Sequence, residues 1–121
     1  MKKLLFVVLT LMAVSLMVAA PALAHDGDTC AHDVATVEAL RDCVEHAIQH
    51  GHIDDPEVAQ GLLDKLDAAQ EAVDRGQIDV AVNILMAFVN EVEAQAGKSI
   101  AEPHASHLVE HAQIVIEALG G

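Results

Sequence analysis

The sequence predicts an all-α fold, a small up-and-down antiparallel bundle of four helices after a cleaved signal peptide. Beyond residue 35, apolar residues recur at spacings of three and four, which is the period of an amphipathic helix. Glycines at 51, 76 and 97 end successive periodic stretches, as glycine does at a helix C-cap. No segment alternates with a period of two, so strands are not expected. Connections of a few residues favour antiparallel neighbours.

The first 24 residues have the order of a secretory signal peptide. Lys2 and Lys3 precede an almost unbroken apolar run from Leu4 to Val18, and the triplet Ala22–Ala24 forms a small-residue cleavage site. A retained membrane anchor is the alternative, but no basic stop-transfer cluster follows the run. The mature chain is therefore expected to be secreted or periplasmic, with no membrane span.

Cleavage would divide the chain into a signal peptide (1–24), an N-terminal arm (25–35) and a helical domain (36–121). Removing 24 of the 121 residues leaves 97, and losing Lys2 and Lys3 changes the formal net charge from −13 to −15. Such an acidic chain lacks the basic patches that nucleic acid requires, so nucleic acid is excluded as a partner. No nucleophile elbow, sheltered carboxylate pair or Gly-rich phosphate loop is present, so neither an enzyme nor a bound organic cofactor is expected.

The first two helices have recognisable boundaries. The first is predicted from Thr36 to His50, and the second begins at Asp55-Pro56-Glu57, where an acid caps the helix and proline occupies the first helical position. The apolar stripe of the first helix comprises Val37, Leu40, Val44, Ala47 and Ile48. That of the second comprises Val58, Leu62, Leu66, Ala69 and Val73.

The third helix is predicted to begin at Asp79 as its N-cap and to end at Gly97, and the fourth starts near Glu102-Pro103. The third buries Ala81, Ile84, Leu85, Phe88, Val92 and Ala96. The fourth buries Ala105, Leu108, Ala112, Val115 and Leu119. The segments 47–54 and 72–79 resemble each other, which indicates that one turn structure is used twice.

Three stretches carry a resemblance to a known family. They are Gly61-Leu62-Leu63-Asp64-Lys65-Leu66-Asp67-Ala68-Ala69-Gln70, Asp74-Arg75-Gly76 and the run from Ala87 to Ile100. This ordered pattern resembles the FIMAH domain over roughly residues 37 to 119. The resemblance implies a small helical module of exported or surface-attached bacterial proteins, including hydrolases, without catalytic residues. No site residue is carried over from it.

Two cysteines in an exported chain most simply form one disulfide, here Cys30 to Cys43, because the compartment is oxidising. A helix that included Cys30 would separate the two by roughly 20 Å and forbid the bridge. The bridge becomes feasible if Thr36 is the N-cap, since residues 30–35 can then run back toward Cys43. The competing hypothesis is a zinc site formed by Cys30, His32, Cys43 and His46.

All eight histidines lie in the predicted mature chain. His46 with His50, and His107 with His111, are i, i+4 pairs, which can chelate a transition-metal ion. In an up-and-down bundle the end of the first helix meets the start of the fourth, so six histidines should gather at one end. The predicted metal ligands, for Zn, Cu or Ni, are His46, His50, His107 and His111. The alternative is that the imidazoles are solvated and supply positive charge below about pH 6.5.

Two functions from different classes follow. The first is an exported, non-catalytic, acidic helical module that mediates interaction with another exported protein or an envelope component. The second is a transition-metal binding or carrier protein that uses the histidines at one end of the bundle. A titration with Zn(II), Cu(II) and Ni(II) distinguishes them.

Overall fold

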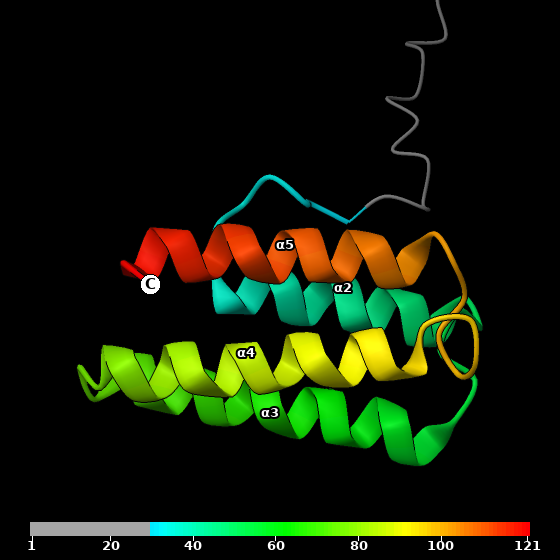
Figure 1. The fold of residues 1–121 in the computed structure, drawn as a ribbon, viewed down its shortest axis with the longest axis horizontal. Coiled ribbons are helices and arrows are strands. Elements are labelled where there is room, and N and C mark those ends of the chain that lie inside the picture. The colour runs from blue at the N-terminus through cyan, green and yellow to red at the C-terminus, as the bar shows by residue number, and fades with distance from the viewer. Residues whose placement is uncertain (1–29) are drawn as a thin grey trace, which may run out of the picture.

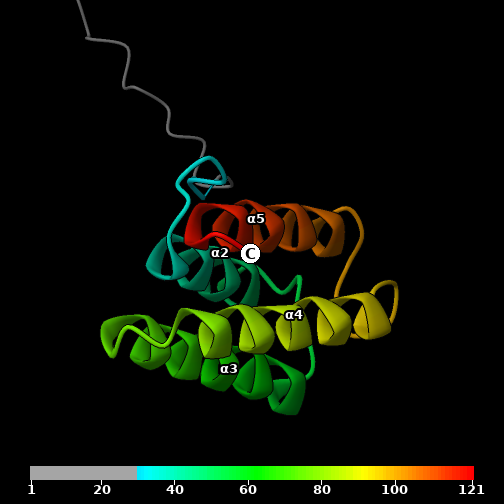
Figure 2. The same ribbon diagram turned by 60° about the vertical axis from the view of Figure 1, so that its left-hand side comes forward.

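The computed structural model describes residues 30–121, and the predicted signal peptide lies outside them. This part of the chain forms four helices: α2 (Val37–Gln49), α3 (Pro56–Asp74), α4 (Ile78–Gln95) and α5 (His104–Leu119). Helices α2 and α5 form one layer and α3 and α4 the other (Figures 1 and 2). Each helix packs against two neighbours, α2 against α3 and α5, and α4 against α3 and α5. The predicted all-α bundle is confirmed.

Side-chain caps determine where the first two helices begin. The Thr36 hydroxyl accepts a hydrogen bond from the Ala39 backbone N–H at 3.1 Å. The Asp55 carboxylate accepts from the Glu57 N–H at 2.9 Å, and Pro56 follows at the first helical position. Both starts are as predicted. These bonds satisfy backbone donors that have no partner within the helix.

The start of α4 differs from the prediction. This helix begins at Ile78 with Gln77 at the N-cap and no side-chain cap, so Asp79 lies in the first turn instead. The reason is the tight turn before it, in which the Gln77 N–H bonds the Ala72 carbonyl at 2.8 Å. The same bond joins His52 to Ala47 at 2.8 Å after α2, so the two similar segments do share one turn structure.

The core lies between the two helical layers and is built from leucine, valine, isoleucine and alanine, with one phenylalanine and Cys43. Phe88 is the largest side chain that is fully buried. In α3 the buried stripe is rotated relative to the prediction: Ala59 and Ala72 are buried, whereas Val58 and Val73 are half-buried at its flanks. Within residues 30–121, no helix combines the length and the apolar character needed to cross a membrane.

Two connections at one end of the bundle pair with each other. The backbone N–H of Asp54 donates to the Ser99 carbonyl at 3.0 Å, and that of Ala101 donates to the His52 carbonyl at 2.8 Å. Between these bonds, Ile53 and Ile100 form an antiparallel bridge and are both buried. The pairing holds the end of α2 beside the beginning of α5 (Figure 1).

We expect Phe88→Ala to lower the free energy of unfolding by about 3–5 kcal/mol, because it removes a fully buried ring and leaves a cavity. Urea denaturation followed by circular dichroism measures the loss. Met86→Ala is the matched control on the same helix, since Met86 is 53 % exposed and its truncation should cost less than about 0.5 kcal/mol. Equal losses in the two variants would contradict the burial of Phe88.

Candidate metal-binding site

A disulfide ties the N-terminal arm to the bundle. Cys30 and Cys43 are bonded, with their Cα atoms 5.1 Å apart. The arm runs back along α5 and α2 before α2 begins (cyan in Figures 1 and 2). This path exists because Thr36 is the N-cap and Cys30 therefore lies outside the helix. The predicted disulfide is confirmed, and Thr36 is the N-cap, as the formation of this bridge required.

His111 of α5 binds the same arm through a hydrogen bond. Its side chain is 1 % exposed, and its Nε2 donates a hydrogen bond to the Val34 carbonyl at 2.8 Å. A carbonyl only accepts, so Nε2 carries the ring proton. The other ring nitrogen, Nδ1, is buried without a hydrogen-bond partner. His111 is thus a core residue that fastens the arm.

The seven histidines in the described part of the chain form a continuous series of ring contacts. His46 lies next to His50, with ring centres 4.2 Å apart, and His50 lies 6.2 Å from His52. Across the paired connections, His52 stacks on His104 at 3.5 Å. The series continues through His104–His107 at 6.3 Å, His107–His32 at 5.4 Å and His32–His111 at 6.1 Å.

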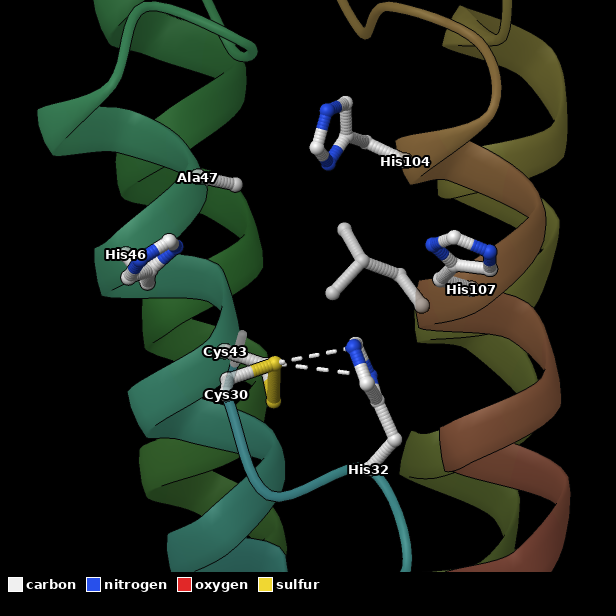
Figure 3. A pocket seen from close by; sticks show the side chains of 8 residues that line it. Cys30, His32, Cys43, His46, Ala47, His104 and His107 are labelled. Atoms are coloured by element: carbon white, nitrogen blue, oxygen red, sulfur yellow. Dashed lines mark hydrogen bonds between the residues drawn. A yellow bond between two sulfur atoms is a disulfide. The ribbon is translucent and has the colours of Figure 1, made fainter. Parts of the chain in front are cut away.

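A pocket of about 120 Å³ opens in the middle of this series, between α2, α5 and the arm. Cys43 and His46 reach it from α2, and His104 and His107 from α5, while the arm supplies Cys30 and His32 (Figure 3). Ala47 and Leu108 complete the lining. Four imidazoles and a disulfide therefore surround one small space.

Ring separation indicates which imidazoles can share an ion. Two imidazoles on one tetrahedral zinc ion, each with a Zn–N bond of about 2.0–2.1 Å, have ring centres about 5 Å apart. His32 and His107, at 5.4 Å, fit this separation. His104 and His107, at 6.3 Å, are farther apart than this. The stacked His52 and His104 rings are too close to bind one ion together.

The four predicted metal ligands are distributed over this region. His46 and His107 line the pocket, whereas His50 does not and contacts His46 from outside it. His111 uses Nε2 on the Val34 carbonyl and contacts His32 with its ring. The structure thus brings His46 and His107 to one pocket and leaves His50 and His111 at its two sides.

Three of the four residues of the alternative cysteine–histidine zinc site, Cys30, His32 and Cys43, lie close together in the structure. Donor atoms of Cys30, His32 and Cys43 all lie within 4.8 Å of one another. The two sulfurs are bonded to each other, however, so they are not thiolates and do not offer the charge that zinc prefers. The Cys30 sulfur is 3.4 Å from His32 Nδ1 and 3.6 Å from Nε2, distances that place it over the ring face.

Burial lowers the pKa of His32 below its usual value near 6.5, because the charged imidazolium loses water contacts. The neighbouring His107 and His111 lower this pKa further, and His46 acts in the same direction. Asp33 opposes them. A neutral imidazole keeps the lone pair that a metal ion needs, so this environment preserves His32 as a ligand at neutral pH.

A comparison with known families matches residues 37–117 to the FIMAH domain. The chain belongs to the FIMAH domain family. The match begins at Val37, the first residue of α2, and covers most of the four helices. No curated protein and no solved structure matches the chain. Cys30 and His32 precede the matched residues, so the pocket is formed jointly by the FIMAH domain and the arm in front of it.

The four predicted metal ligands did not include His52 or His104, and His32 was considered only in the competing cysteine–histidine zinc site. A signal for His104 existed in its spacing with His107 and His111, which places all three on one side of a helix. The position of His32 depends on the path of the arm, and that path follows from the Thr36 cap and the disulfide together. The contact between His52 and His104 depends on the paired connections, which the local sequence does not specify.

Protein produced in an exporting host should contain no free thiol. Alkylation without reduction is expected to leave the intact mass unchanged, and alkylation after reduction should add two groups, one on Cys30 and one on Cys43. Intact-mass spectrometry reads both results. Two groups added without reduction would contradict the disulfide.

Stability in metal-free buffer should fall as the pH drops below about 6.5. With a lowered pKa in the folded state, His32 binds fewer protons there than in the unfolded chain, so its contribution is complete above pH 6.5 and is lost below. His32→Gln should therefore reduce the slope of the unfolding free energy against pH. Urea denaturation between pH 7.5 and 5 measures it, and a slope as steep as that of the wild type would contradict the assignment.

Proposed function

We propose that this protein is an exported, non-catalytic helical module that binds a transition-metal ion through its histidine cluster. The observation that carries the proposal is the continuous contact of seven imidazoles, four of which line one pocket. Solvated histidines scattered over a surface have no reason to gather in this way. Imidazole is a preferred ligand of Zn(II), Cu(II) and Ni(II).

His32 and His107 are the proposed central ligands, because their ring separation of 5.4 Å suits a shared ion. His104 and His46 lie on the same pocket and can add a third ligand, with water completing the shell. The chain's formal net charge of −13 attracts cations to this site over a long range. Export, the signal peptide and the lack of catalysis are parts of the same proposal.

Interaction with another exported protein or an envelope component is the second candidate function. It is favoured by Val80 and Met86, apolar residues of α4 that are 46 % and 53 % exposed. Helix α4 carries no histidine, so binding of a partner there would leave the metal pocket accessible. The two functions are therefore compatible, and a metal carrier that docks on another protein would combine them.

Zn(II), Cu(II) or Ni(II) should raise the melting temperature of tag-free oxidised protein at pH 7.5. At a free ion concentration of 100 times Kd the stabilisation is about 2.7 kcal/mol, or roughly 10–20 °C for a domain of this size. The double variant His32→Ala/His107→Ala should lose this shift. Binding should also fade below pH 6, where protons compete for the imidazoles.

His50→Ala is the matched control, since His50 belongs to the ring series but does not line the pocket. It should keep most of the metal-dependent shift. An unchanged melting temperature with all three ions, or an equal loss of the shift in the control and in the double variant, would contradict the proposed site.

A further inference from the structure

We propose that reduction of the Cys30–Cys43 disulfide converts the pocket into a mixed thiolate–imidazole site for Zn(II), so that metal affinity is under redox control. The inference rests on the proposed metal function, because the same imidazoles take part. It adds two ligands of a different kind and a condition under which they become available. Two thiolates with two imidazoles form the S₂N₂ set that favours tetrahedral zinc.

The two sulfurs lie beside the imidazoles that would share the ion. Both cysteines line the pocket together with His32, His46 and His107. Donor atoms of Cys30, Cys43 and His32 already lie within 4.8 Å of one another, close enough to hold one metal ion together. Figure 3 shows the disulfide turned toward His32 rather than away from the pocket. A purely structural bridge could lie anywhere along the arm.

The arm has an anchor besides the disulfide. Buried His111 donates a hydrogen bond from Nε2 to the Val34 carbonyl, and the Thr36 cap fixes the next turn of the chain. Turn hydrogen bonds from His32 N–H to Cys30 carbonyl and from Val34 N–H to Ala31 carbonyl shape the arm itself. Opening the disulfide therefore leaves Cys30 and His32 next to the pocket.

A reductant can reach the disulfide from the Cys30 side. Cys43 is 2 % exposed, whereas Cys30 is only partly buried. A thiolate of a dithiol reductant can attack the Cys30 sulfur, which breaks the S–S bond and releases Cys43 as a thiolate. The second thiol of the reductant then displaces Cys30. Two electrons and two protons pass to the protein, and the reductant leaves as its own disulfide.

Zinc binding then replaces the two thiol protons, which are released to solvent as Zn(II) accepts both sulfurs. His32 must turn its ring, since the Cys30 sulfur now lies over the ring face and not in line with a nitrogen. Because Zn(II) binds the dithiol more tightly than the disulfide, the ion also makes the disulfide easier to reduce. A hundredfold difference in affinity corresponds to about 60 mV in the midpoint potential.

The test compares Zn(II) affinity in oxidised and phosphine-reduced wild-type protein under anaerobic conditions, by competition with a chromogenic chelator. Reduction should tighten Zn(II) binding at least a hundredfold. Co(II) used in place of Zn(II) should show thiolate-to-metal charge-transfer absorption only in the reduced protein. His32→Gln should weaken Zn(II) binding to the reduced form, and His50→Gln, the matched control outside the pocket, should not.

The double variant Cys30→Ser/Cys43→Ser separates thiolate ligation from release of the arm, because it has neither the bridge nor the thiols. It should bind Zn(II) no more tightly than the oxidised wild type. Equal Zn(II) affinity in this variant and in the reduced wild type, or no Co(II)–thiolate absorption, would overturn the inference. Binding to the oxidised protein without tightening on reduction also overturns it and leaves the proposed function standing. Binding only after reduction supports it and refutes metal binding by the imidazoles alone.

Discussion

The pairing of the two connections at one end of the bundle is the constraint on which the candidate site depends. Ile53 and Ile100 are buried against each other there, with backbone hydrogen bonds on both sides. Buried backbone groups must find partners, so this short bridge satisfies two loops that would otherwise leave donors and acceptors unpaired at the core. It fixes the end of α2 against the start of α5, and the stacking of His52 on His104 follows directly.

A second constraint comes from the arm, which precedes the residues that match the FIMAH domain. The arm contributes Cys30 and His32 and is fastened by a disulfide at one point and by buried His111 at another. Two fastenings over so few residues leave the arm little freedom, so His32 is held between His107 and His111. The helices alone would present two histidine-bearing faces. The arm closes the space between them and turns them into a pocket.

Most of the fold could be predicted from the sequence because its signals are local. Helix periodicity, the Thr36 and Asp55 caps and the glycine turns each act within a few residues, and they give the number and order of the helices and all their starts except that of α4. The candidate site could be predicted less completely from the sequence. That histidines gather at one end follows from topology, but the selection of His32 and His107 depends on ring positions set by contacts distant in sequence. The burial of His111 was missed because an imidazole in an apolar stripe looks the same whether it faces solvent or a backbone carbonyl.

The choice of histidine in so acidic a chain has a physical logic. A formal charge of −13 attracts metal ions and protons alike, so carboxylates alone would hold hard cations weakly and with little selectivity. Imidazole nitrogens prefer softer ions than carboxylates do, and burial lowers the pKa of His32, which keeps this ring neutral to lower pH than a solvated histidine. Under the proposed function, the acidic surface would concentrate cations near the protein, while the imidazole pocket would discriminate among them. The proposed selectivity would then arise in a space lined by imidazole nitrogens and by the disulfide rather than by carboxylates.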